Sequence, residues 1–138
     1  MQHPDHNLIA LGVRQPWAEL IIRGQKTLEV RSTGTRVRGP IYLYASKKPA
    51  TIPAAVAAAR RFELALDELQ TGQIIGTVEI VEAVRCQPQD ADDACLPKAL
   101  VRGKWGWRLA NPVRLTRPLA PRFQPYGIWF YPFRRRHD

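Results

Sequence analysis

The sequence has few of the residues that build disulfide frameworks and metal sites. It contains two cysteines, Cys86 and Cys95, and three histidines, His3, His6 and His137, all near the ends of the chain. No pair of these residues has the spacing of a zinc site, and no histidine lies near a serine for nucleophilic catalysis. We therefore predict no metal and no cofactor, and we interpret both cysteines as free thiols in a reducing cytoplasm.

Long hydrophobic runs are missing as well. No apolar stretch reaches the roughly 18 residues that span a membrane, and residues 1–7 lack the apolar segment of a signal peptide. We expect a cytoplasmic protein with no membrane partner. Hydrophobic residues still make up 45% of the 138 residues and charged residues 24%, which is typical of one globular domain and not of a disordered chain.

Acidic side chains are scarce at both ends of the chain. Of the net charge of +9, residues 1–48 carry +5, residues 49–100 carry −4 and residues 101–138 carry +8. If the fold brings the two basic ends together, one surface will attract a polyanion. Arginine outnumbers lysine by 16 to 5, which favours bidentate phosphate contacts. A basic balance that merely keeps the protein in solution is the alternative.

Short hydrophobic segments separated by glycine and proline predict a mixed fold. Strands are predicted at residues 8–13, 27–31, 41–45, 74–84, 105–109 and 127–131, and helices at residues 16–24 and 53–69. Gly76 interrupts the fourth strand, where a bulge is expected. Residues 86–103 are expected to be irregular. This pattern indicates an α+β protein, a small mixed β-barrel with two main helices on its flanks.

Several motifs give the sequence a recognisable pattern. They are Arg14-Gln15-Pro16-Trp17, residues 24–31 (Gly-Gln-Lys-Thr-Leu-Glu-Val-Arg), Arg38-Gly39, residues 45–48 (Ala-Ser-Lys-Lys) and Trp105-Gly106-Trp107. With them the sequence resembles the ASCH domain family over residues 8–131. A single domain is therefore expected there, with short tails at residues 1–7 and 132–138. The variant is most similar to the ASCH domain of a eukaryotic transcription coactivator, which shares the Gln-Pro-Trp start.

The resemblance implies a PUA-like fold, a small β-barrel with a cleft between its first helix and the barrel. Family members are proposed to hold RNA there, and some bind DNA without sequence preference. A few are ribonucleases or amidohydrolases that act on acetylated cytidine nucleosides. Three functions stay open: a module that binds RNA or another single-stranded nucleic acid, which we favour; a hydrolase using the same cleft; and a module that docks on a transcription or translation complex.

The candidate nucleic-acid-binding residues belong to these motifs. They are Arg14, Gln15, Lys26, Glu29, Arg31, Arg36, Arg38, Ser46 and Lys47. Lys26 enters a strand and is expected either to reach across the cleft to a phosphate or to be a solvated lysine. Glu29 and Arg31 share a strand face. Either Arg31 supplies charge while Glu29 orients Lys26 or accepts from a base, or the two form a structural ion pair.

The remaining candidates lie at element ends and in a loop. Arg14 and Gln15 precede a helix, whose free N–H groups favour an anion. Ser46 and Lys47 follow a strand that should end at the cleft, and Arg36 and Arg38 are candidates for backbone phosphates. Trp105 and Trp107 share a strand face, where they either stack a base or fill the core.

Enzymatic activity is the less favoured prediction. If the protein is an enzyme, Lys26 and Glu29 are the candidate catalytic residues. In the amidohydrolase members of the family a threonine nucleophile occupies the position of Glu29, and a carboxylate is a poor substitute for it. A ribonuclease needs a base and a cation near the 2′-OH and phosphate, which Glu29 and Lys26 would supply.

Overall fold

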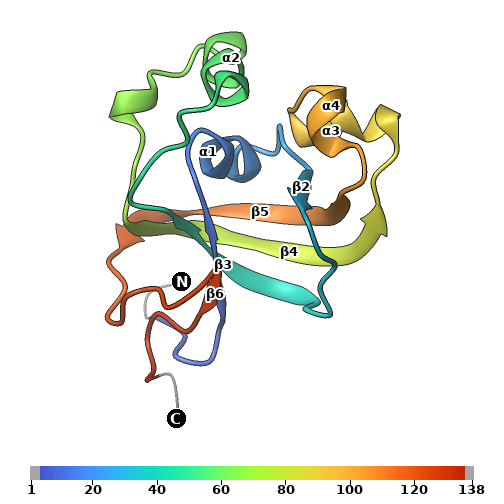
Figure 1. Cartoon of the computed structure of the whole chain (residues 1–138). Coiled ribbons are helices and arrows are strands. Elements are labelled where there is room, and N and C mark those ends of the chain that lie inside the picture. The colour runs from blue at the N-terminus through green and yellow to red at the C-terminus, as the bar shows by residue number, and fades with distance from the viewer. Residues whose placement is uncertain (1–3, 136–138) are drawn as a thin grey trace.

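Six β-strands form one curled sheet in the computed structural model, which describes residues 4–135. The strands are β1 (Ala10–Val13), β2 (Leu28–Arg31), β3 (Gly39–Ala45), β4 (Gln73–Arg85), β5 (Trp105–Leu119) and β6 (Trp129–Phe130). Their order across the sheet is β2-β5-β4-β3-β1-β6 (Figure 1). Neighbouring strands are antiparallel except β1 and β3, which are parallel because the chain crosses over between them. The predicted α+β fold with a small mixed β-barrel is confirmed, and the sheet has the form of a curled half-barrel.

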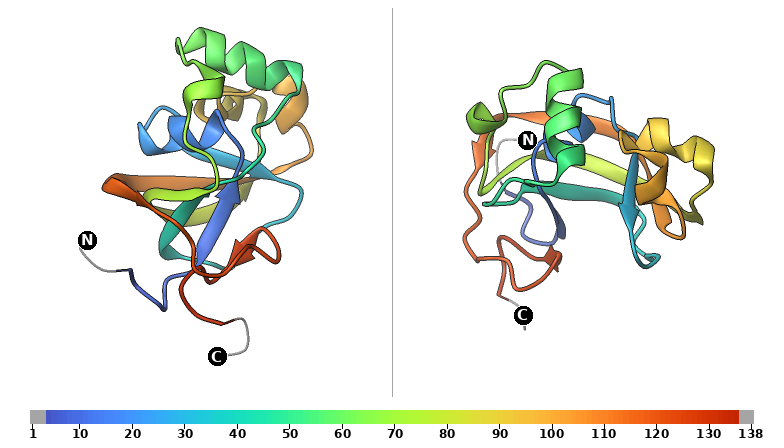
Figure 2. Two further views of the ribbon diagram at one scale, coloured as in Figure 1. Left: turned by 90° about the vertical axis from the view of Figure 1, so that its left-hand side faces the viewer. Right: turned by 45° about the horizontal axis from the view of Figure 1, so that its top comes forward.

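The helices gather on one face of this sheet (Figures 1 and 2). The two longest are α1 (Trp17–Ile22) and α2 (Pro53–Arg61). Four shorter helical turns are η1 (Leu66–Glu68), η2 (Pro88–Asp90), α3 (Ala91–Ala94) and α4 (Lys98–Val101). Within residues 4–135, no helix has the length and apolar character needed to cross a membrane.

The hydrophobic core occupies both faces of the sheet. Alternate side chains of β3 enter different clusters: Leu43 packs with Ile21 of α1 on the helical face, and Tyr42 and Tyr44 pack with Phe130 on the other. Because β3 is buried on both faces, its sequence is a continuous apolar run and not an alternating one. The centre of the sheet is therefore covered by buried side chains on both faces.

The C-terminal segment continues this packing beyond residue 131. Phe133 is buried and meets the ring of Tyr42 edge-on, with ring centroids 5.7 Å apart. The guanidinium of Arg134 lies over the ring of Tyr131 at 3.6 Å. Parts of the two predicted tails, residues 1–3 and 136–138, lie outside the described residues, and the domain limits at 8 and 131 stay a prediction.

The predicted irregularity at Gly76 is confirmed. The pairing of β4 with β5 shifts register between Ile74 and Gly76. A Cβ atom at Gly76 would lie only 2.3 Å from Cδ1 of Ile22 and from the carbonyl oxygen of Val113. Only glycine therefore lets α1 approach the sheet this closely.

The prediction of one helix over residues 53–69 is wrong in length. Helix α2 ends at Arg61, and Glu63 takes a left-handed conformation with φ of 56°. This turn lets Phe62 and Leu64 pack against Leu20 of α1. Tertiary packing of two apolar side chains overrides the helical propensity of the alanine-rich segment.

Two other segments differ from the sequence-based expectation. Residues 86–103 are not irregular but form the turns η2, α3 and α4, which are too short to give a helical periodicity. Strand β5 does not stop at Leu109 but continues through Asn111-Pro112 to Leu119. Asn111 has a φ of 52°, and the pairing with β4 shifts nearby. This irregularity accommodates the proline within a strand.

Candidate functional site

A pocket of about 950 Å³ opens beside α1. Its walls come from the end of β1, helix α1, strand β2, the segment after β3, the α3–α4 region and the loop before β6. Segments far apart in the sequence thus converge at one place. Small-molecule and cofactor sites in proteins have volumes of roughly 300–1,000 Å³, so this pocket can hold a ligand of nucleotide size.

Basic side chains dominate the polar part of the pocket lining. The basic lining residues are Arg14, Lys26, Arg31, Lys47, Lys48 and Lys104, and among the described residues 4–135 the single acidic one is Glu29. Arg14, Lys47, Lys48 and Lys104 are exposed, and none of these four forms an ion pair with another residue in the range 4–135. Arg14 and Lys47 belong to the basic N-terminal segment and Lys104 to the basic C-terminal segment, so the fold brings cations from both to one pocket.

Lys26 lies inside the protein and not at the pocket mouth. Only 1% of its side chain is exposed. Its Nζ donates a hydrogen bond to the carbonyl oxygen of Ala94 at 2.5 Å and lies 3.6 Å from Oε1 of Glu29. Burial lowers the pKa of Lys26, and the neighbouring carboxylate of Glu29 opposes this shift. The ammonium, which the sequence predicts either to reach a phosphate or to be solvated, therefore has protein partners.

Glu29 joins Lys26 to Arg31. Its Oε2 accepts a hydrogen bond from Nε of Arg31 at 2.9 Å and lies 2.6 Å from Nη2 of Arg31 in an ion pair. The same Nη2 also donates to the carbonyl oxygen of Gly12 at 2.9 Å. These three side chains form a linked group, the Lys26–Glu29–Arg31 triad, which connects β2 to β1 and to α3. The formal charge of the triad is +1, and its members contact one another and the backbone.

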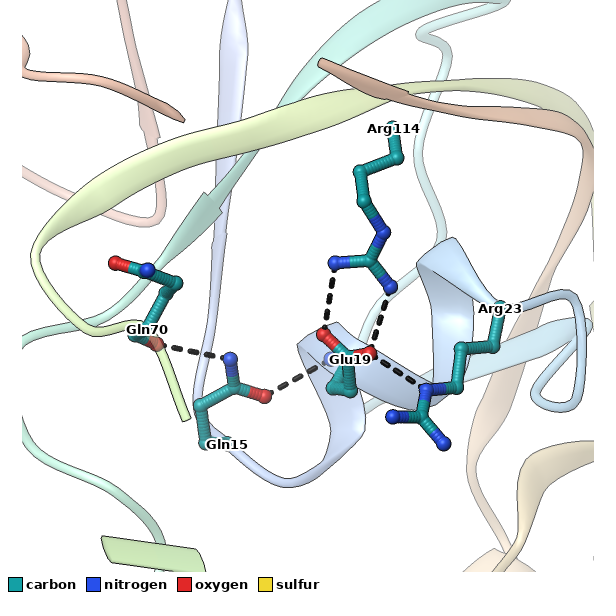
Figure 3. Close-up of polar contacts among 5 residues, drawn as sticks. All are labelled: Gln15, Glu19, Arg23, Gln70 and Arg114. Carbon is teal, nitrogen blue, oxygen red and sulfur yellow. Dashed lines mark hydrogen bonds and ion pairs between the residues drawn. The ribbon is translucent and has the colours of Figure 1, made fainter. Parts of the chain in front are cut away.

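Gln15 lies outside the pocket and positions helix α1 (Figure 3). Its side chain is fully buried, accepts a hydrogen bond from the backbone N–H of Glu19 and donates one to the carbonyl oxygen of Gln70, both 2.9 Å long. Glu19 in turn contacts Arg114 and Arg23, each at 2.6 Å. Burial alone would raise the pKa of Glu19, but the bonds to the two guanidinium groups hold it below its usual value.

The other candidates divide between the pocket and the surface. Ser46 lines the pocket together with Lys47. Arg36 and Arg38 are exposed in the β2–β3 loop and do not line it. One nitrogen of Arg38, Nη1, donates to the carbonyl oxygens of Thr35 and Val37.

The paired tryptophans fill the core instead of lining the pocket. Trp107 is 1% exposed, stacks on Trp129 with ring centroids 5.7 Å apart, and donates its indole N–H to the carbonyl oxygen of Thr33. Trp105 is half-buried, and the guanidinium of Arg85 lies 4.5 Å from its ring. Neither tryptophan is placed to stack a base in this pocket.

Sequence reasoning missed several pocket residues. Tyr44, Lys48, Leu100, Lys104 and Ile128 line it without having been selected. Lys48 is next to Lys47 and could have been found there, whereas Lys104 comes from a distant segment with no local signal. Tyr44 has a buried hydroxyl without a hydrogen-bond partner, and burial raises its pKa.

The cysteines and acidic residues form no metal site in the part of the chain that the structure describes. No group of three or more histidine, cysteine, aspartate or glutamate side chains lies close enough to hold an ion in residues 4–135. Cys86 and Cys95 are both free thiols, as expected, and burial raises the pKa of each.

Comparison with known proteins places this fold and sequence in a family. The structure is similar to the crystal structure of ASCH from Zymomonas mobilis, with a TM-score of 0.59 and 17% sequence identity. The match covers 96% of this chain and 91% of the other chain. A tyrosine-to-phenylalanine variant of that protein matches with a TM-score of 0.58 and 16% identity, over 89% of this chain and 88% of the variant. A serine-to-alanine variant matches with a TM-score of 0.59 and 17% identity, over 94% of this chain and 90% of the variant. The fold is therefore of the α+β, PUA-like type. No curated protein matches the sequence. The family model of the ASCH domain matches residues 11–117, and the chain therefore belongs to the ASCH domain family.

Proposed function

We propose that this protein binds single-stranded RNA at the pocket beside α1. The observation that carries the proposal is a set of four exposed cations around one pocket, Arg14, Lys47, Lys48 and Lys104, which form no ion pair with any residue in the described range 4–135. Solvated cations that converge on one opening attract a polyanion and release its counterions on binding. Membership of the ASCH family, which has a PUA-like fold and generally binds RNA, supports RNA as the ligand.

The pocket residues divide into two roles in this proposal. The four exposed cations contact phosphates of the strand, and Ser46 supplies a hydroxyl beside them. The Lys26–Glu29–Arg31 triad, with a formal charge of +1, forms part of the pocket wall. Arg36 and Arg38 lie outside the pocket, so only a strand that extends past it would reach them.

The salt dependence of binding tests this proposal. For a labelled single-stranded RNA of about ten nucleotides, four phosphate contacts predict a slope of log K against log salt of about −3. Replacing Lys47 and Lys48 with alanine should make the slope shallower by about 1.4. Lys98→Ala is the matched control, because Lys98 is exposed on α4 but does not line the pocket.

Two results would contradict the proposal. A slope near zero would indicate a neutral ligand or a protein partner, and would favour docking on a transcription or translation complex, the role suggested by the resemblance to the coactivator type. If replacing Lys47 and Lys48 changed the salt slope no more than Lys98→Ala does, the RNA would bind elsewhere on the surface. The same titration with single-stranded DNA would show whether the protein distinguishes the two nucleic acids.

One observation favours a hydrolase as the second candidate function. The carboxylate of Glu29 and the ammonium of Lys26 lie 3.6 Å apart in the pocket lining, and burial lowers the pKa of the amine. A ribonuclease would use Glu29 as the base and Lys26 to stabilise the developing charge. Glu29 occupies the threonine position of the amidohydrolases, which disfavours that reaction. Multiple-turnover cleavage that is lost in Glu29→Gln, with RNA affinity retained, would establish the ribonuclease over the binding module.

A further inference from the structure

We infer that the RNA strand continues from the pocket across one end of the sheet, where Arg36, Arg38 and Arg85 bind the phosphates of flanking nucleotides. This inference rests on the proposed RNA binding and adds to it a second contact surface, outside the pocket. We call these three residues the sheet-end arginines. The inference follows from the segments that meet at this end of the sheet, from their charge and from the contacts that hold two of the three side chains.

Three segments far apart in the sequence meet beside the pocket. Arg31 of β2, Trp105 of β5 and Arg85 of β4 lie opposite one another in neighbouring strands. Neighbouring strands are about 4.8 Å apart, so the backbone of Arg85 lies roughly 10 Å from that of Arg31, which lines the pocket. Figure 1 shows the β2–β3 loop, the end of β4 and the start of β5 at the same, right-hand end of the sheet. The sheet-end surface therefore begins where the pocket ends.

The β2–β3 loop is fixed to this end of the sheet. It starts at Ser32, which lines the pocket. Gly34 packs so closely on the ring of Trp105 that an added Cβ atom would lie 3.3 Å from Cε3 of that ring. The indole N–H of Trp107 donates to the carbonyl oxygen of Thr33 at 3.0 Å. The loop thus carries its two arginines from the edge of the pocket onto the sheet end.

Positive charge is continuous from the pocket to the sheet end. Residues 32–38, 83–86 and 102–106 belong to the three segments and contain five basic and no acidic residues. The sheet-end arginines are exposed, and none of them forms an ion pair with another residue in the range 4–135. Lys104 lines the pocket and directly precedes Trp105, so it joins the two groups of cations. An uninterrupted row of cations suits a polyanion that is longer than the pocket.

The protein already holds two of the three guanidinium groups in place. Nη1 of Arg38 donates to the carbonyl oxygens of Thr35 and Val37, both at 2.8 Å. The guanidinium of Arg85 lies 4.5 Å from the centroid of the Trp105 ring. A side chain that is ordered before binding loses less entropy on binding, and a guanidinium has further N–H donors for a phosphate. These contacts favour a binding surface over arginines that merely keep the protein in solution.

The test measures the salt dependence of binding for a labelled single-stranded RNA of about ten nucleotides. The four cations at the pocket alone predict a slope of log K against log salt of about −3, and three further phosphate contacts predict about −5. Replacing the three sheet-end arginines with alanine should return the slope to about −3 and weaken binding at low salt about 3- to 150-fold. The single variant Arg36→Ala, which leaves the contacts of the other two arginines intact, should make the slope shallower by about 0.7.

The matched control replaces three other exposed arginines, Arg60, Arg61 and Arg117, with alanine. These residues do not line the pocket. Arg61 lies over the ring of Phe62, as Arg85 lies over its tryptophan, so the control also removes one arginine–ring contact. The net charge falls by the same amount in both triple variants. The slope should stay near about −5 in the control.

The outcomes separate this inference from the proposed function. If the sheet-end triple variant has the same slope as the parent, the sheet-end surface is refuted and RNA binding at the pocket stands. Equal changes of slope in the two triple variants would also refute it, because the effect would then follow net charge alone. A slope near zero in the parent would overturn the proposed function itself. If the sheet-end triple variant melts at a lower temperature than the parent, the slope of Arg36→Ala decides between these results.

Discussion

Replacing Glu29 with glutamine tests whether the Lys26–Glu29–Arg31 triad stabilises the fold. The substitution preserves the shape of the side chain and removes the one carboxylate that, among residues 4–135, contacts the buried ammonium of Lys26. Removing one partner of a buried ion pair costs about 3–5 kcal/mol. The cost should be smaller here, because Lys26 and Glu29 are 3.6 Å apart, Lys26 also bonds to the carbonyl of Ala94, and Arg31 is partly exposed. We therefore expect a loss of about 2–3 kcal/mol in the free energy of unfolding.

The assay is thermal unfolding, with Glu82→Gln as the matched control. A loss of this size should lower the melting temperature of Glu29→Gln by roughly 6–12 °C for a domain of this length. Glu82 is half-exposed, and its ion pair with Arg108 is 3.9 Å long. Surface pairs of this kind contribute about 0–1 kcal/mol, so the control should change little. Equal melting temperatures for the two variants would refute a stabilising role of the triad.

The pH dependence of the same variant provides a second readout. Burial already lowers the pKa of Lys26 below its usual value of 10.5, and loss of the Glu29 carboxylate should lower it further. Between the lowered pKa and 10.5 the unfolded chain binds more protons than the folded one, so stability rises with pH. The stability deficit of Glu29→Gln should therefore shrink as the pH approaches 10.5, where a neutral amine needs no counter-charge. A deficit that is constant up to this pH would contradict the assignment to Lys26.

Three further predictions follow from other contacts. Gly76→Ala should lower the free energy of unfolding by about 3 kcal/mol, because its Cβ would clash with Ile22 and a backbone carbonyl; Gly127→Ala, with no neighbour closer than 3.8 Å, is the control in urea denaturation. The Glu19 carboxylate, whose pKa is lowered by Arg114 and Arg23, should stabilise the protein above pH 4.5, and this contribution should disappear as the pH falls through the lowered pKa. If the free energies of unfolding of the parent and of Glu19→Gln differed by the same amount at pH 7 and at pH 3, this prediction would be wrong. Glu29→Gln should bind RNA slightly more tightly, because one repelling charge leaves the pocket, and weaker binding in a fluorescence-anisotropy titration would instead indicate a direct contact of Glu29 with the RNA.

Sequence alone determined the features that depend on local pattern. Side-chain alternation placed Glu29 and Arg31 on one face of β2, where they form an ion pair. Gly76 marked the irregularity in β4, because a side chain there has no space. The motifs and their spacing identified the ASCH family, and with it the α+β fold built on a mixed β-barrel. These properties can be predicted from the sequence because each depends on neighbouring residues or on a short motif.

Only the tertiary structure decided which residues form the site and whether their side chains are buried, ion-paired or exposed. Lys26 is buried and not solvated because its ammonium meets the carbonyl of Ala94, 68 residues away in the sequence. Lys104 joins Arg14 and Lys47 at one pocket because the chain folds β1, β3 and the start of β5 towards the same side. Helix α2 ends early because Phe62 and Leu64 pack on α1. Long-range contacts of this kind leave no periodicity in the sequence, since burial and partner choice are fixed only when distant segments meet.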